Sequence, residues 1–197
     1  MAIAAISMPF IRMEGGNNEP CVQKDAVAEA AAQTWLKDSL VYIVVGAGGV
    51  PTLNKVATGG VLVYGQSPDP SVGTGLSTPP TKLFGTNHFA FDVRDRIIEI
   101  NIASATAGGG TGAQIGTANG VTWAGGGTNG VGAGGMGPGQ QYGIYVPTSG
   151  TYNNYQFLDV NNVATPLFEI VSLAPGMGVN DNNPRVWVKI IPTKIQG

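Results

Sequence analysis

The chain has 197 residues, a formal net charge of −2 and a single cysteine. This length is typical of one domain, or of one domain with a large insertion, and it is enough to bury a core without crosslinks. A lone cysteine, Cys21, excludes an intrachain disulfide framework. The slight negative charge argues against nucleic acid as a partner, because phosphate binding needs clustered lysine and arginine.

The composition is poor in charge and rich in glycine. Charged residues make up 11% of the chain, against about 25% in an average globular domain, and 31 residues are glycine. This favours a surface that other subunits cover; a monomer with a neutral polar surface is the alternative. No apolar run approaches the ~20 residues of a membrane helix, and the start lacks the basic region of a signal peptide. We therefore expect a soluble chain made in the cytoplasm, with no membrane partner.

Residues 1–20 are predicted to form an N-terminal arm. The arm is mostly apolar until the sequence GGNNEP interrupts it at residues 15–20. Its candidate contact residues are Phe10, Ile11, Arg12 and Met13. Two interpretations are open: the arm adds a first strand to its own sheet, or it reaches to a neighbouring subunit. The rest of the chain, residues 21–197, is predicted to form a single β domain.

The segment 25–32, DAVAEAAA, contains the strongest helix formers in the chain. It predicts either one or two helical turns or an extended lead-in to residues 33–36. Three short apolar runs follow, at 40–45, 50–56 and 61–64, and glycine-rich breaks separate them. Valine, isoleucine and tyrosine between such breaks are typical of strands. We expect an antiparallel meander around which the rest of the fold packs.

Alternating apolar and polar residues predict further strands in the second half of the chain. The segments 88–93 and 97–102 are predicted to form a hairpin around the turn DVRDR. The other predicted strands lie at 81–84, 141–146, 155–160, 167–173 and 185–191. Together these elements predict a mainly β fold, an antiparallel barrel or sandwich with at most one short helix.

A glycine-rich insertion spans residues 103–140. It holds about half of the chain's glycines and almost no charge. Val121 and Trp123 predict one short strand within a long, irregular loop. Because glycine loses the most backbone entropy on ordering, we expect this loop to order only against a partner or against its own domain.

The sequence offers no convincing catalytic or metal-binding set. His88 is the only histidine, and with Cys21 it falls short of the three or four ligands of a zinc site. Asp92 and Asp95 flank a turn that also carries two arginines, and a hydrolase using Asp92 or Glu99 is the least favoured hypothesis. We therefore expect a protein that is not an enzyme and that has no catalytic, cofactor-binding or metal-binding residues.

Five aromatic residues lie close to the glycine-rich insertion or after it. They are Trp123, Tyr142, Tyr145, Tyr152 and Tyr155. Such residues bind sugars by stacking, anchor protein interfaces or pack in a core. The sequence leaves these three interpretations open.

Several stretches carry a family pattern. After the arm come AAAQTWLKDSLVYI, a glycine turn and VLVYGQSPD, and the chain closes with NDNNPRVWVKIIP. These stretches, roughly the first third and the last tenth, resemble the capsid decoration (cement) proteins of tailed bacteriophages. In that family a strand pair of the type hydrophobic, then Lys-Gly-x-Leu-Val, leads into a second short pattern. Here Asp38 and Ser39 stand where glycine is usual, and Tyr64-Gly65-Gln66 stands in place of the second pattern.

The resemblance implies a β-rich, often trimeric protein on the outer face of a phage head. The implied function is to stabilise contacts between capsid subunits, at the capsid surface of the virion. The implied partners are the major capsid protein and further copies of this chain, as a homotrimer. The expected contact residues are Phe10, Ile11, Arg12, Met13, Trp123, Tyr142 and Tyr145. A carbohydrate-binding or tail-fibre-type receptor-binding module is the alternative.

Overall fold

The computed structural model describes a mainly β protein. The described residues are 13–14, 24, 27–30, 32–46, 48–71, 87–88, 90–103, 137–148, 153–160, 162–177 and 185–197. Across these ranges the chain forms strands and one short 3-10 helix, η3 (Pro192–Lys194), and no α-helix. The predicted mainly β class is therefore confirmed.

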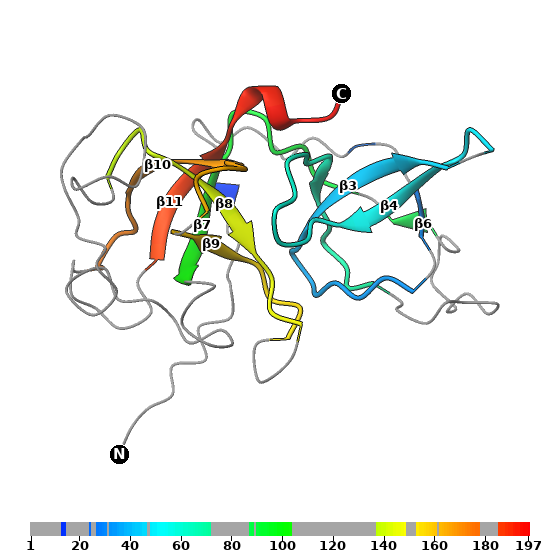
Figure 1. The fold of residues 1–197 in the computed structure, drawn as a ribbon, viewed down its shortest axis with the longest axis horizontal. Helices are drawn as coiled ribbons and strands as arrows, with labels where there is room; N and C mark the ends of the chain where they lie inside the picture. Colours follow the sequence, from blue (N-terminus) through cyan, green and yellow to red (C-terminus); the bar gives the residue numbers. More distant parts are fainter. Residues whose placement is uncertain are drawn as a thin grey trace, which may run out of the picture.

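Five strands close into a barrel, on the left of Figure 1. In order around the barrel they are β7 (Ile97–Ala103), β11 (Arg185–Ile190), β10 (Phe168–Leu173), β8 (Gln141–Tyr145) and β9 (Phe157–Asp159). The parallel pairing of β9 with β7 closes the ring, and the other barrel pairs are antiparallel. A two-residue strand, β1 (Met13–Glu14), extends the edge of β7.

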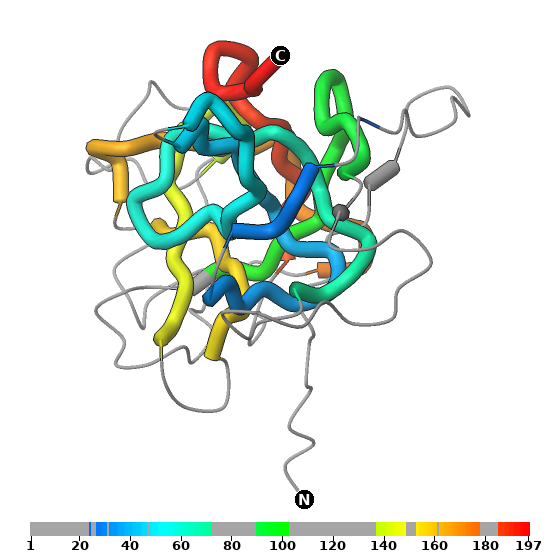
Figure 2. Tube along the Cα trace, turned by 90° about the vertical axis from the view of Figure 1, so that its right-hand side faces the viewer, coloured from blue at the N-terminus to red at the C-terminus, as the bar shows by residue number. Residues whose placement is uncertain are grey.

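A second, curled sheet lies beside the barrel. Its strands, in order, are β5 (Gly65–Gln66), β3 (Leu40–Val45), β4 (Pro51–Lys55), β2 (Val27–Glu29) and β6 (Asn87–His88). Only the β2–β4 pair is parallel. Figure 2 looks from the side of this sheet, and its cyan and teal chain lies in front of the barrel.

The barrel strands form because their apolar residues alternate. In β11, Val186, Val188 and Ile190 are buried in the barrel, as the sequence predicts. The intervening residues point outward, where Lys189 pairs with Glu169 on β10 at 2.8 Å. The antiparallel pairs of β11 with β10 and β7 place these buried faces on one interior.

Strand β3 contributes to two hydrophobic clusters at once. Leu40 is fully buried with the barrel residues, and Tyr42 packs at the edge of that cluster. Val41 points to the opposite face, where it packs with Trp35 and Tyr64 in a second cluster. Because successive side chains of a strand point to opposite faces, one strand joins the barrel core to the second core.

A buried glutamine side chain fastens the second sheet to the barrel. Gln156, just before β9, is 2% exposed. Its amide oxygen accepts a hydrogen bond from the N–H of Leu40 at 2.6 Å, and its amide N–H groups donate to the carbonyls of Leu40 and Val56 at 2.9 and 2.8 Å. The amide thus satisfies three backbone groups where β3 begins and β4 ends.

The segment after β11 makes a second attachment. Ile195 forms a parallel bridge with Val63. The side-chain amide of Gln196 then accepts from the N–H of Ile43 at 2.7 Å and donates to its carbonyl at 3.0 Å. Gln196 therefore acts on the edge of β3 as a neighbouring strand would.

Of the two alternatives for residues 25–32, the extended one holds at 27–29, which form strand β2, because pairing with β4 and β6 outweighs helix propensity. Two other expectations about local structure are wrong. The third strand of the meander is β5, not residues 61–64, of which only Val63 makes a bridge. The segments around 88–93 and 97–102 form no hairpin, since β6 pairs with β2 and β7 pairs with β1, β9 and β11.

Other predicted strands are confirmed, or they fall outside the described residues. The β3–β4 hairpin and strands β8, β9, β10 and β11 lie where they are predicted. The predicted strands at 81–84 and 121–123 fall outside the described residues, as does most of the 103–140 insertion. The division into an arm and a single domain stays a prediction.

Gly143 on β8 leaves room for a tight turn that packs on the barrel. A Cβ atom built there lies 2.3 Å from Nδ2 of Asn162 and 2.9 Å from the carbonyl oxygen of Thr165. The Asn162 side chain is itself fixed by its hydrogen bonds with Thr165. We predict that Gly143→Ala lowers the free energy of unfolding by about 1–3 kcal/mol, measured by urea titration. Gly48→Ala, where a Cβ meets nothing within 4 Å, is the control and costs no stability.

The Gln156 amide gives a second prediction. In Gln156→Glu a carboxylate oxygen faces two carbonyls, and we expect a loss of about 3 kcal/mol or more at pH 8. Folding then favours the protonated carboxyl, so its folded pKa rises above the unfolded value of about 4.3. The loss is therefore smallest near pH 4 and grows as the pH rises through the folded pKa.

Gln33→Glu is the matched control for this charge. The side-chain oxygen of Gln33 accepts a hydrogen bond from the N–H of Lys55 at 3.0 Å, a role that a carboxylate fills equally well. We expect its free energy of unfolding to stay within about 0.5 kcal/mol of the parent at both pH values. Equal losses in the two variants would show that the Gln156 amide is not specifically required.

Candidate functional site

The candidate catalytic carboxylates are held in structural contacts. Asp92 accepts a hydrogen bond from the backbone N–H of Arg94 at 3.0 Å and pairs with its Nε at 2.9 Å. Glu99 on β7 pairs with Arg185 and accepts a hydrogen bond from the indole N–H of Trp187 at 3.1 Å. Glu99 therefore joins β7 to β11 on the barrel surface, and Asp92 fixes the turn before β7.

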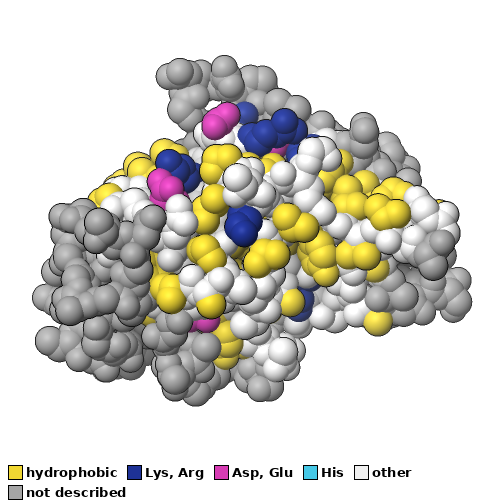
Figure 3. Space-filling view, turned by 45° about the horizontal axis from the view of Figure 1, so that its top comes forward, with side chains coloured by type: hydrophobic (Ala, Val, Ile, Leu, Met, Phe, Trp, Pro, Cys, Tyr) yellow, Lys and Arg dark blue, Asp and Glu magenta, His cyan; other side chains and the backbone are white. Residues whose placement is uncertain are grey.

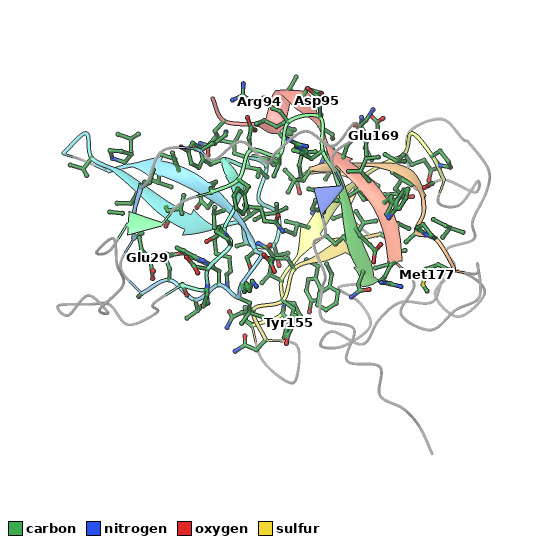
Figure 4. The ribbon with its side chains drawn as sticks, turned by 180° about the vertical axis from the view of Figure 1, so that it is seen from behind. Glu29, Arg94, Asp95, Tyr155, Glu169 and Met177 are labelled. Carbon is green, nitrogen blue, oxygen red and sulfur yellow. The ribbon has the colours of Figure 1, made fainter. Side chains whose placement is uncertain are left out.

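The ion pairs among the described residues are spread over several elements: Asp92 contacts Lys24 and Arg94, Glu99 contacts Arg185, and Glu169 contacts Lys189. Figure 4 places Glu29 on the second sheet, Asp95 at the turn before β7 and Glu169 on the barrel. Among the same residues, no group of three or more His, Cys, Asp or Glu is placed to hold a metal ion. The side chains of His88 and Cys21 lie outside the described set.

No helix found among the described residues is both long and apolar enough to span a membrane.

The buried side chain of Lys24 contacts three segments around the second sheet. The Lys24 side chain is 8% exposed, and its Nζ donates to the carbonyl of Gln196 at 2.8 Å. The same ammonium lies 4.4 Å from the centre of the Tyr64 ring and 3.8 Å from Asp92. Burial lowers the pKa of Lys24, and the Asp92 carboxylate opposes that shift. These contacts fasten the segment before β2 to the segment after β11.

Of the predicted aromatic group, the structure describes Tyr142, Tyr145 and Tyr155, and these differ in burial. Tyr142 is 1% exposed in the barrel core, and its hydroxyl donates to the side chain of Gln140 at 2.8 Å. Burial raises the pKa of Tyr142 to about 12. The expectation that Tyr142 contacts a partner is therefore wrong, because β8 turns this side chain inward. Tyr145 and Tyr155 are half-buried, and Figure 4 shows Tyr155 at the lower edge of the molecule.

The other predicted contact residues lie mostly outside the description. Phe10, Ile11, Arg12 and Trp123 belong to undescribed segments, and their contact roles stay predictions. Met13 is in β1, where its backbone pairs opposite Ile98 of β7. At this point the arm adds to the sheet of its own domain, which was one of the two interpretations.

The structure adds a surface that sequence reasoning missed: an apolar hairpin tip, made of Val44, Val45 and Val50. These side chains are 39%, 64% and 61% exposed. Figure 1 shows the β3–β4 hairpin projecting away from the barrel, and Figure 3 shows hydrophobic side chains gathered on that side. The chain carries no charge from Leu40 to Asn54. In the sequence, the signal for this exposed tip was a glycine turn with two valines directly before it and one directly after it.

A hollow of about 340 Å³ adjoins the hairpin. It is lined by Tyr42, Ala57, Thr58, Gly59, Gly60, Val61 and Leu62. Val61 and Leu62 are 38% and 40% exposed, and the lining contains no charged side chain. Tyr42 lies on the same face of β3 as Val44, two residues nearer the core, so the hollow and the apolar tip share a strand face.

The wall of the hollow is fastened to the barrel. The hydroxyl of Thr58 donates to the carbonyl of Val146 at 3.2 Å and accepts from its N–H at 2.8 Å. Gly59 has φ +74°, a value that favours glycine, and turns the chain there. A Cβ on Gly60 would lie 2.7 Å from Cγ1 of Val56. The glycines therefore allow a tight, preformed wall.

The described residues thus include an exposed apolar tip and, beside it, a hollow without charged lining residues. An apolar tip and an uncharged hollow suit contact with another apolar surface, because neither buries an unpaired charge. No protein-family model, no curated protein and no solved structure matches this chain.

Proposed function

We propose that this protein is a structural virion component that binds the outer face of a phage head and stabilises contacts between capsid subunits. The proposal rests on the decoration-protein resemblance of its first third and last strand. The observation that carries it is the uncharged, projecting hairpin with Val45 and Val50 more than half exposed. Exposed apolar groups of this kind mark sites of protein contact.

Magnitudes favour several copies acting together. Burying one of these valines contributes about 1.5 kcal/mol, so Val45 and Val50 together contribute about 3 kcal/mol. Association of two proteins costs an estimated 4–15 kcal/mol in lost translational and rotational freedom. One tip is therefore too weak by itself. A homotrimer would carry three tips. Once one tip has bound, the other two bind at a high effective concentration, so the trimer attaches more tightly than a single tip.

The low overall charge agrees with this role. With 11% charged residues the chain offers few groups that resist desolvation. A partner surface that is itself apolar can then cover the tip without leaving an ion unpaired.

We predict that Val45→Lys and Val50→Lys each weaken attachment to capsids about tenfold or more, because about 1.4 kcal/mol corresponds to a factor of ten. The measurement is co-sedimentation of the purified protein with heads built from the major capsid protein of the same phage. Both side chains are exposed, so folding is expected to be retained, which a thermal melt checks.

Val163→Lys is the matched control. Val163 is 41% exposed and lies between β9 and β10, not on the hairpin. This variant is expected to bind heads as the parent does. The proposal fails if the hairpin variants bind unchanged, or if all three variants lose binding equally.

A further inference from the structure

We propose that the hollow beside Tyr42 is the socket for the apolar arm, residues 1–12, of a second copy of this chain. This inference rests on the proposed assembly of several copies and names the contact that joins them. The hollow is the acceptor, and the arm of a neighbouring copy inserts one or two apolar side chains.

The socket suits an apolar side chain in size and chemistry. Its volume of about 340 Å³ lies at the small end of the ~300–1,000 Å³ typical of binding pockets. Val61, Leu62 and Ala57 supply apolar contact, and the polar groups at the wall are the Tyr42 and Thr58 hydroxyls and backbone. A charged side chain would find no partner among the lining residues and would lose its hydration.

The socket is also preformed, which lowers the entropic cost of binding. Both hydrogen bonds of the Thr58 hydroxyl go to Val146, at the end of β8, and the N–H of Gly59 points to the carbonyl of Ile144 at 3.4 Å. The loop is therefore tied to the barrel before any partner arrives. A rigid acceptor leaves only the arm to be ordered on binding.

The arm has the matching chemistry. Residues 1–11 contain no charged side chain, and the larger apolar residues among them include Ile3, Ile6, Met8 and Phe10. Residue 13 is held on β7 of its own barrel, so the preceding 12 residues have a fixed starting point. At about 3.3 Å per residue they reach roughly 40 Å when extended, which is far enough to cross to a neighbouring copy.

We assign the arm to a second copy because arm exchange joins the several copies that the proposed function requires. Val61 and Leu62, 38% and 40% exposed, are the apolar surface that such an arm would cover. If every copy gives one arm and receives one, the contact runs head to tail and closes into a ring, as a trimer requires. Arm exchange also gives each copy an attachment that does not use the hairpin tip.

The test is a crosslink between two distinguishable copies. All proteins carry Cys21→Ser; one preparation adds Phe10→Cys, and a second, with a size tag, adds Leu62→Cys. The two are mixed, allowed to exchange and oxidised mildly without capsids. We expect a disulfide-linked species of mixed size in high yield, because a residue in the socket brings the two Cα atoms within the ~4.4–6.8 Å that a disulfide needs.

A matched control uses Val163→Cys in place of Leu62→Cys. Val163 has nearly the same exposure, 41% against 40%, but is not one of the residues that line the socket. It is expected to give only the background yield of random collision. Equal yields at the two positions, or no mixed species at all, overturn the proposal.

Two further measurements separate the possible outcomes. A single chain carrying both Phe10→Cys and Leu62→Cys shows whether its own arm fills the socket, and a monomeric internal crosslink in high yield overturns the second-copy assignment. Leu62→Lys is expected to weaken self-association at least tenfold in light scattering, while Val163→Lys leaves it unchanged. If the Val45→Lys variant no longer attaches to capsids but still forms the crosslink, each proposal is supported by its own measurement. If the crosslink is absent and capsid attachment is intact, only the socket proposal is overturned.

Discussion

The side-chain amide of Gln156 is the interaction on which the arrangement of the two sheets depends. It satisfies the N–H and C=O of Leu40 and the C=O of Val56 in a place that water does not reach. Buried backbone groups without partners cost free energy comparable to a lost hydrogen bond. This neutral amide therefore completes the hydrogen bonding of β3 at the point where Leu40 enters the barrel core.

The fixed start of β3 determines where the other end of the strand, the hairpin tip, lies. Leu40 and Val41 are buried on opposite faces, the Gln196 amide covers the edge at Ile43, and beyond it the exposure rises to 64% at Val45. A hairpin anchored this firmly at one end holds its tip away from the barrel. The hollow follows from the same geometry, because the chain returning from β4 must turn at Gly59 and Gly60 beside Tyr42.

Sequence patterns predicted the strands better than their partners. Alternation located β8, β10 and β11 and the inward residues of β11, because the facing of a strand is a local property. The pairing of β7 with β11 and β9 joins distant segments, which no local pattern specifies. Tyr142 was assigned to a surface for a related reason: whether an aromatic side chain faces inward depends on strand register and barrel closure. The hairpin tip was recognisable only as a strand signal, since exposure of its valines depends on how far β3 extends beyond the core.

Charge is distributed unevenly over the described surface, and this bears on the orientation of the protein in an assembly. The outer face of the barrel carries two ion pairs, Glu99 with Arg185 and Glu169 with Lys189. The hydrogen bond from Lys189 lowers the pKa of Glu169. The hairpin tip carries no charge at all. Partly exposed ion pairs lose hydration if a partner covers them, whereas valines gain from being covered. In the proposed assembly the hairpin end therefore faces the capsid subunit, and the charged barrel face stays in contact with water.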